Sequence, residues 1–230
     1  MIIWGPGIRH NFYLCAMTFL IELHYLPPVD LWALLSSSES TLIIEQHDHY
    51  QKGSYRNRCT IAGSQGPQAL SIPLVKGKHQ AMPAKEVRIA WDTPWARTHW
   101  RSIVSAYGNA PFFEHYQDSL AHLFDQKDIY LWDWNLRLFH WLKDQLRMPG
   151  ELSFTQEYHS LPTPACIDLR NTLRPSVRGA TNAFSTSIPY LQVFSDRLGF
   201  LPGLCGLDLL FCSGPQAISI LQSMRTNPGL

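Results

Sequence analysis

The chain has 230 residues, of which 45% are hydrophobic and 16% charged, enough for a sizeable apolar core and too apolar for a disordered chain. Its 19 Lys and Arg against 18 Asp and Glu give a formal net charge of +1, so no overall field favours nucleic acid or an anionic membrane surface. The five cysteines form no CxxC pair, which disfavours structural zinc and suits a reducing compartment, so we expect a cytoplasmic protein.

The N-terminal residues 1–16 are interpreted as a mis-called start or a disordered extension, because Met17 opens an apolar run typical of a first strand. The apolar stretch Asn11 to Ile21 is about half the length of a membrane-spanning helix. It also lacks the basic start and cleavage site of a signal peptide. A genuine extension is the alternative, and in either case we expect one domain over residues 17–230.

The first half of this domain predicts an α/β unit. An apolar strand is broken by Pro27 and Pro28, which precede an apolar helix, and a β-branched run then predicts a second buried strand. A hairpin and a half-exposed strand follow. The predicted elements are strand Thr18 to Leu23, helix Val29 to Leu35, strand Thr41 to Glu45, hairpin strands Cys59 to Ala62 and Ala69 to Val75, and strand Glu86 to Ala90.

The second half predicts helices and then a loop. Thr93 resembles a helix cap, with Pro94 at the first helical position. Prolines recur between residues 151 and 189 and predict a long irregular loop before an apolar tail. The fold class is therefore α/β, with an N-terminal sheet unit, a helical layer and an irregular C-terminal loop region. The predicted helices run from Pro94 to about Gly108, from Phe112 to Asp125 and from Trp132 to Arg147.

A polar stretch from His47 to Arg58 separates two apolar strands and is the first candidate site. If its end begins a strand, Arg56 and Arg58 point to one face, where guanidinium groups bind phosphate or carboxylate bidentately. Lys52 adds a third positive charge against Asp48 alone. The stretch therefore predicts an anion-binding site, and a solvated loop at a sheet edge is the alternative.

Three histidines are candidates for proton transfer, because imidazole titrates near neutral pH. His24 follows the first strand, at the edge where open α/β sheets place ligands. His49 lies in the polar stretch, where His47 and His49 have a spacing seen in some metal sites, but no further ligand motif supports a metal. His99 lies on the first long helix, and Tyr107 and Asn109 lie where that helix ends.

The common catalytic and cofactor motifs are absent from the sequence. We find no GxSxG elbow, GxGxxG fingerprint or GxxxxGK[ST] loop, and this argues against the common hydrolases, dinucleotide-binding proteins and P-loop proteins. We therefore predict no cofactor.

Several blocks of the chain together resemble the WbqC-like family. The resemblance spans about Phe19 to Leu221, nearly the whole chain. The family pattern differs in having glutamine in place of His24 and an acidic pair followed by Val-Gln-Phe near His47 to Tyr50. The blocks are His24-Tyr-Leu-Pro-Pro28, Glu45-Gln-His-Asp-His-Tyr-Gln-Lys-Gly-Ser-Tyr-Arg-Asn-Arg58, Leu70-Ser-Ile-Pro-Leu-Val75, His99-Trp-Arg-Ser-Ile103, Tyr107-Gly-Asn-Ala-Pro-Phe-Phe113, Gly199-Phe-Leu-Pro202 and Leu207-Asp-Leu-Leu-Phe211.

The resemblance implies a role in bacterial surface-polysaccharide (O-antigen-like) biosynthesis, with transfer of an amino acid or acyl group onto an amino sugar. The expected partner is an activated sugar or another anionic small molecule, held by Lys52, Arg56 and Arg58, while His99 or His24 moves a proton. Asn57 and Tyr107 are expected to orient the substrate. Two alternatives are a non-catalytic binding or assembly protein of the same pathway and a metal-dependent hydrolase using His47 and His49.

Overall fold

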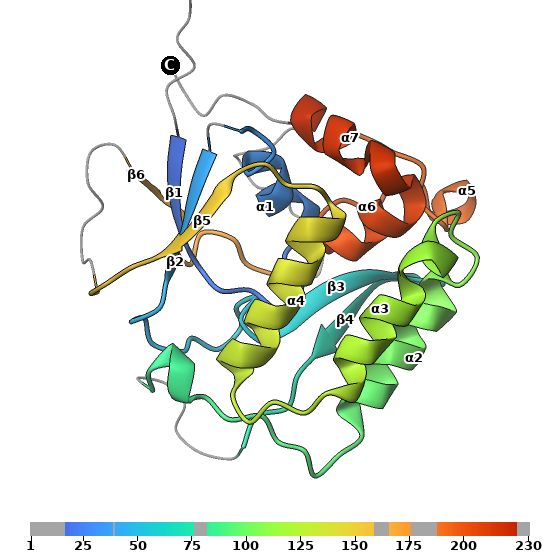
Figure 1. Ribbon diagram of the computed structural model, residues 1–230. Helices are drawn as coiled ribbons and strands as arrows, with labels where there is room; N and C mark the ends of the chain where they lie inside the picture. Colours follow the sequence, from blue (N-terminus) through green and yellow to red (C-terminus); the bar gives the residue numbers. More distant parts are fainter. Residues whose placement is uncertain (1–16, 39, 76–81, 159–165, 176–187, 225–230) are drawn as a thin grey trace, which may run out of the picture.

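The structure is a computed structural model that describes residues 17–38, 40–75, 82–158, 166–175 and 188–224. Its strands form a four-stranded sheet in the order β5-β2-β1-β6 and a separate two-stranded sheet of β3 and β4 (Figure 1). The strands are β1 (Met17–Glu22), β2 (Ser40–Glu45), β3 (Arg58–Gly63), β4 (Gly66–Ser71), β5 (Glu151–Phe154) and β6 (Cys166–Asp168).

The four-stranded sheet is parallel throughout. The inner strand β1 is apolar because it is covered on both faces: Phe19 on one face is 1% exposed and Leu20 on the other is 3% exposed. Parallel strands need a crossover, and helix α1 (Val29–Leu34), buried along its whole length, provides it between β1 and β2. The register pairs Glu22 of β1 with Glu45 of β2, so two acidic residues end neighbouring strands at the same edge.

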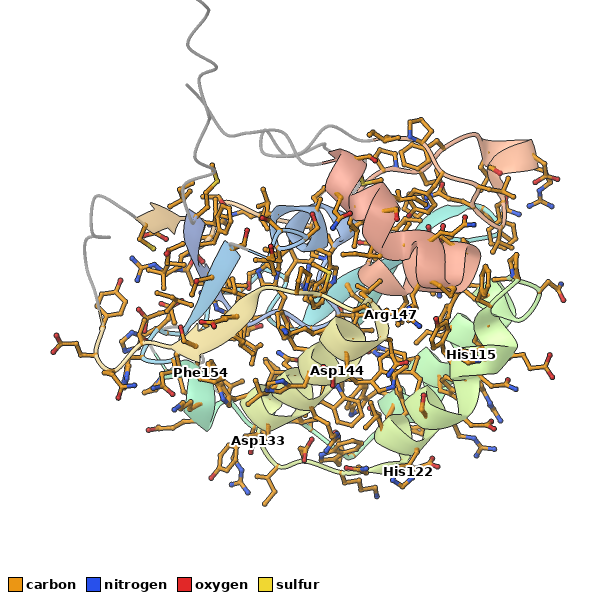
Figure 2. The ribbon with its side chains drawn as sticks, turned by 45° about the horizontal axis from the view of Figure 1, so that its top comes forward. His115, His122, Asp133, Asp144, Arg147 and Phe154 are labelled. Atoms are coloured by element: carbon orange, nitrogen blue, oxygen red, sulfur yellow. The ribbon has the colours of Figure 1, made fainter. Side chains whose placement is uncertain are left out.

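The antiparallel hairpin β3–β4 packs against the first long helix that follows it in the chain (Figure 1). Helices α2 (Trp95–Tyr107) and α3 (Phe113–Asp125) lie side by side, and α4 (Leu131–Gln145) packs close to the short 3-10 helix η1 (Ala84–Glu86). Their apolar residues face inward, while polar side chains of α3, α4 and the turn after α4 point to solvent (Figure 2). Exposed examples are His115, His122, Asp133, Asp144 and Arg147.

The C-terminal part covers α1. It comprises α5 (Ser195–Leu198), α6 (Gly206–Ser213), the 3-10 helix η2 (Gly214–Gln216) and α7 (Ala217–Met224). The start of α6 approaches α1 so closely that a Cβ atom at Gly206 would lie 2.7 Å from Nε1 of Trp32. Glycine therefore lets the two helices pack in direct contact.

A buried polar network fastens the segment before α5 to helix α6. Asp208 is 0% exposed, and its Oδ2 accepts hydrogen bonds from the Tyr190 hydroxyl at 2.6 Å and the Gln192 amide at 3.0 Å. The same Gln192 side chain bonds both the N–H and the carbonyl of Leu201. Burial raises the pKa of Asp208 to about 6 against the lowering effect of these hydrogen bonds.

The structure confirms the α/β class but corrects three local predictions. Strands β5 and β6 lie inside the segment for which a loop was predicted, because pieces of four and three residues carry no readable periodicity. The strand predicted over Glu86 to Ala90 is wrong: Arg88 and Ile89 form only isolated bridges. Pro94 is the N-cap residue of α2, with φ −80° and ψ 42°, and not its first helical residue.

Among the described helices, none combines the length and apolar character needed to cross a membrane. The prediction about residues 1–16 falls outside the described residues.

Candidate functional site

Charged side chains meet at the carboxyl ends of the parallel strands. Glu22 ends β1, Glu45 ends β2 and Asp168 ends β6, and all three strands run in the same direction. Glu22 and Glu45 are 2% and 1% exposed. Open α/β sheets bind their ligands at this edge, so the cluster is the candidate site.

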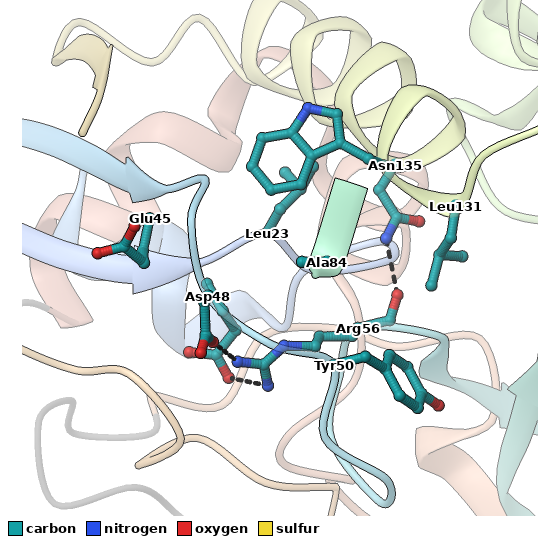
Figure 3. A pocket seen from close by; sticks show the side chains of 10 residues that line it. Leu23, Glu45, Asp48, Tyr50, Arg56, Ala84, Leu131 and Asn135 are labelled. Carbon is teal, nitrogen blue, oxygen red and sulfur yellow. Dashed lines mark hydrogen bonds and ion pairs between the residues drawn. The ribbon is translucent and has the colours of Figure 1, made fainter. Parts of the chain in front are cut away.

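Arg56 is the central cation of this cluster and is 3% exposed. Its Nη1 lies 3.4 Å from Oε1 of Glu22 and donates to Oδ1 of Asn171 at 3.0 Å, while its Nη2 contacts Oδ2 of Asp48. Its backbone carbonyl accepts a hydrogen bond from Asn135 of α4 at 2.7 Å (Figure 3). The guanidinium is thus already paired with carboxylates inside the protein.

Glu22 and His24 form the part of the cluster best suited to proton transfer. Nε2 of His24 lies 3.4 Å from Oε1 of Glu22, and His24 is 1% exposed. Within the described part of the chain, neither ring nitrogen of His24 makes a hydrogen bond. Burial raises the pKa of Glu22, but contacts with His24, Arg56 and the Asn171 N–H outweigh it and lower that pKa to about 2. Glu22 is therefore a carboxylate at neutral pH.

The backbone after β1 is strained. Leu26 has φ 45°, a left-handed conformation that leucine seldom adopts. The turn is held by surrounding contacts, since the Tyr25 N–H donates to the Tyr55 carbonyl at 2.8 Å and the His24 ring lies 5.3 Å from the Tyr55 ring. His24 thus occupies a fixed position, as strained functional loops often provide.

A second guanidinium joins β2 to β6. Arg170 donates from Nη1 to Glu45 at 3.2 Å and from Nη2 to Asp168 at 2.6 Å. The other oxygen of Glu45 accepts from the Thr155 hydroxyl at 2.7 Å and the His47 N–H at 2.9 Å. Burial raises the pKa of Asp168, but its bonds to Arg170 outweigh this and lower it.

Carboxylates outnumber guanidinium groups in this cluster by four to two. The narrow pocket beside them has a cavity volume of about 10 Å³, which is room for about one water molecule. Figure 3 shows the Arg56 guanidinium in direct contact with Asp48, while the carboxylate of Glu45 points away from this pair. The excess negative charge suits a ligand that carries a positive charge. The carboxylates are Glu22, Glu45, Asp48 and Asp168, and the guanidinium groups belong to Arg56 and Arg170.

The predicted residues of the polar stretch separate into buried and exposed sets. Lys52, Arg58, His47 and His49 are exposed, whereas Arg56 is buried in the cluster. Among the described residues, no group of three or more His, Cys, Asp or Glu side chains is arranged to hold a metal ion. The structure thus keeps Arg56 apart from the exposed basic side chains with which the sequence grouped it.

Of the next three candidate residues, two are buried and one is exposed. Asn57 is buried, accepts from the Tyr50 hydroxyl at 3.0 Å and donates to the Ile72 carbonyl at 2.9 Å. Tyr107 is 0% exposed, and its hydroxyl accepts from the Ala62 N–H at 2.9 Å. Asn109 is exposed.

His99 is held inside the aromatic core. Its Nδ1 lies 2.9 Å from the Tyr25 hydroxyl, and its ring packs edge-on against Trp95. Burial lowers the pKa of His99 to about 4, although a hydrogen bond with the Ser71 backbone opposes the change. His99 is therefore neutral at pH 7, and of the two histidines His24 is the one beside the carboxylates.

Sequence reasoning missed most of the acidic members of the cluster. Glu22 and Glu45 each close a run of apolar residues, a repeated pattern that could have drawn attention to them. Asp168 and Arg170 carried no such signal, because β6 has only three residues.

Comparison with known proteins places the chain in a family. The model of the WbqC-like protein family matches residues 23–173, which include Arg56 and the ends of β2 and β6. The chain belongs to the WbqC-like protein family. It is also similar to the uncharacterized protein Rv1507c of Mycobacterium tuberculosis (strain ATCC 25618 / H37Rv), with 26% identity over 232 residues that cover 90% of this chain and 97% of that protein. No solved structure matches the chain.

The matched region of this WbqC-like protein ends shortly after Asn171. All the charged residues of the cluster except Glu22, which lies one residue before it, fall inside the match. Most of the charged cluster therefore lies in the part of the chain that the family model matches.

Proposed function

We propose that this WbqC-like protein is a transferase of bacterial surface-polysaccharide biosynthesis, moving an amino-acid or other acyl group from an activated donor to an amino sugar. The observation that carries the proposal is the buried Glu22–His24 pair at the carboxyl edge of the parallel sheet, 3.4 Å apart. The family resemblance in the sequence supports the pathway.

The proposed chemistry is the attack of an amine on an activated carbonyl. The amine must lose a proton as its bond to the carbonyl carbon forms and the bond to the leaving group breaks. In the proposal, a ring nitrogen of His24 accepts that proton, and the neighbouring carboxylate of Glu22 stabilises the imidazolium that results.

The charge of the cluster supports an amine as the acceptor. Four carboxylates, three of them buried, against two guanidinium groups would attract an ammonium group before it is deprotonated. Lys52 and Arg58 are exposed, and in the proposal they hold the phosphate or carboxylate of the donor. Arg56 serves mainly to hold Glu22 and Asp48 in place, because it is ion-paired with both.

The test compares surface polysaccharide, by mass spectrometry, from a bacterial strain lacking this gene and from the same strain carrying variants. We expect the deletion to remove an amino-acid or acyl substituent and the unmodified gene to restore it. Glu22→Gln is expected to restore at most a few per cent, since replacing the carboxylate that orients and stabilises a catalytic imidazole with an amide costs about 10⁴-fold in a comparable triad. Glu86→Gln, which changes an exposed glutamate, is the matched control.

His24→Gln is the most discriminating variant, because the family pattern has glutamine at this position. Loss of the substituent, with the protein folded by circular dichroism, supports proton transfer by His24. Full restoration by His24→Gln would remove that role, and a polysaccharide unchanged by the deletion would reject the transferase itself.

A second candidate is a non-catalytic binding protein of the same pathway. Two observations favour it: Lys52 and Arg58 are exposed, and the cavity beside the cluster has a volume of only about 10 Å³. A docking protein would lose its function in Lys52→Ala/Arg58→Ala and keep it in Glu22→Gln. The transferase predicts a severe defect in Glu22→Gln, so the same assay separates the two.

A further inference from the structure

A second pocket lies away from the charged cluster, between the segment that leads into α2, the first turns of α2 and the end of α3. Its volume is about 550 Å³, within the range of small-molecule sites. The two pockets share no lining residue. The lining side chains that matter for its chemistry are Trp91, Asp92, Arg97, Trp100, Asp125 and Lys127.

Trp91 gives this pocket a rigid aromatic wall. Its Nε1 donates to the Asp128 carbonyl at 2.7 Å, and its ring packs against Trp95 at 5.0 Å and Trp134 at 5.8 Å between centroids. The ammonium of Lys127 lies 5.8 Å from the Trp91 ring centroid. The indole is thus fixed before any ligand arrives, and it accepts groups of positive partial charge on its face.

Trp100 contributes a second aromatic group. It is half-buried, and its ring packs against Phe113 and Phe124, with centroids 6.2 and 6.0 Å away. On this side Trp100 packs against the hydrophobic core. The remaining surface lines the pocket.

Polar groups at this pocket remain available for a ligand. Asp92, Arg97 and Asp125 are exposed, and within the part of the chain that the structure describes their side chains make no hydrogen bond or ion pair. Together with Lys127, the lining carries two carboxylates and two cations. Hydrogen-bonding groups are therefore present without a net charge.

We propose that this pocket binds an uncharged pyranose sugar of one or two rings. A pyranose presents an apolar face of C–H groups, which packs on an indole, and a rim of hydroxyl groups, which bond to carboxylates and guanidinium. The balanced charge favours a neutral ligand over an ionic one. This inference does not rest on the proposed transferase, since binding requires no turnover and uses other residues.

The experiment is saturation-transfer NMR on the full chain, with methyl β-D-glucopyranoside and cellobiose as probes at about 10 mM, suited to millimolar affinity. Sorbitol, which has the hydroxyl groups but no ring, and glucuronate, which adds a negative charge, are the comparison ligands. We expect transfer to ring C–H protons of both glucosides, weaker transfer to glucuronate and none to sorbitol.

Variants then locate the binding. Trp91→Leu keeps an apolar side chain but removes the aromatic face, and we expect at least about fivefold weaker binding, as for a lost aromatic contact. Trp91→Phe should recover most of the affinity. Asp92→Asn/Asp125→Asn should weaken binding, whereas Asp118→Asn, an exposed change on α3 outside the pocket, should not.

Three results with the probe ligands would overturn the inference. They are no transfer to either glucoside, equal transfer to sorbitol, and unchanged affinity in a folded Trp91→Leu variant. A change of oligomeric state in Trp91→Leu without any sugar binding would also overturn it, because the pocket would then be a contact between chains. None of these results depends on whether the protein transfers an acyl group.

Discussion

The guanidinium of Arg56 lies 3.4 Å from the carboxylate of Glu22, although 34 residues separate them. This buried contact ties the end of β1 to the polar stretch between β2 and β3. It also changes the role expected of Arg56. The sequence predicted that Arg56 binds a ligand anion, but its positive charge is already neutralised by carboxylates within the protein.

Arg56→Met should therefore destabilise the protein. Removing one partner of a buried ion pair leaves carboxylates without compensation and costs about 3–5 kcal/mol. Urea denaturation followed by tryptophan fluorescence measures the loss in unfolding free energy. Arg58→Met, a change at an exposed neighbour, should alter stability by no more than about 0.5 kcal/mol. Equal stability of the two variants would contradict the structural role of Arg56.

Glu22→Gln should alter the response to acid. Glu22 has its pKa lowered from 4.5 to about 2 by the folded state, so its contribution to stability is complete above pH 4.5 and is lost as the pH falls toward 2. The shift corresponds to at most about 3 kcal/mol. Denaturation at several pH values measures the free energy of unfolding. Below pH 4.5 this free energy should fall less in Glu22→Gln than in the unmodified protein, whereas Glu86→Gln should show the same pH dependence as the unmodified protein.

Asp208→Asn should act in the opposite sense. Asp208 has its pKa raised from 3.8 to about 6, so in the folded protein its protonation adds stability that is full below pH 3.8 and is lost as the pH rises through 6. The difference amounts to at most about 3 kcal/mol. An amide keeps a hydrogen-bonding group beside Tyr190 but cannot titrate. We expect the unfolding free energy of the variant not to decline in this way between pH 4 and 6. An unchanged pH profile would disprove the raised pKa.

Gly206→Ala should lower the thermal stability. The added Cβ would lie 2.7 Å from Nε1 of Trp32 and 3.1 Å from Leu142, and Trp32 is held by its hydrogen bond to the Pro27 carbonyl at 3.2 Å. Crowding of this kind costs about 1–3 kcal/mol, more than alanine gains as a helix former. Calorimetry should show a lower melting temperature than in Ser219→Ala, an exposed change on α7. A melting temperature equal to that of the control would show that α6 can shift.

The sequence predicted the elements whose hydrophobic pattern is contained in one short stretch of residues. Apolar runs located β1 and β2, and helical periodicity located α2, α3 and α4 within a few residues of their bounds. Strands β5 and β6 escaped because their stability comes from pairing with β2 and β1, a contact that no short window of sequence contains.

The site was predicted only in part for the same reason. His24 and Arg56 stood out by residue type, but their partners depend on tertiary contacts. Asn171, which donates to Glu22 from 149 residues away, could not be assigned to the site without the sheet order. Arg56 was predicted to bind a ligand anion, because nothing near it in the sequence shows that Glu22 would contact it.

The parallel pairing of β1 with β6 also sets an order of events during protein synthesis. Glu22 is made early, whereas Asp168 and Asn171, which complete its surroundings, are made 146 and 149 residues later. A nascent chain that stops before Asn171 has left the ribosome can form β1, α1 and β2 but not the finished cluster. Glu22 can pair with Arg56 early, whereas Glu45 lacks its guanidinium partner Arg170 until most of the chain has emerged.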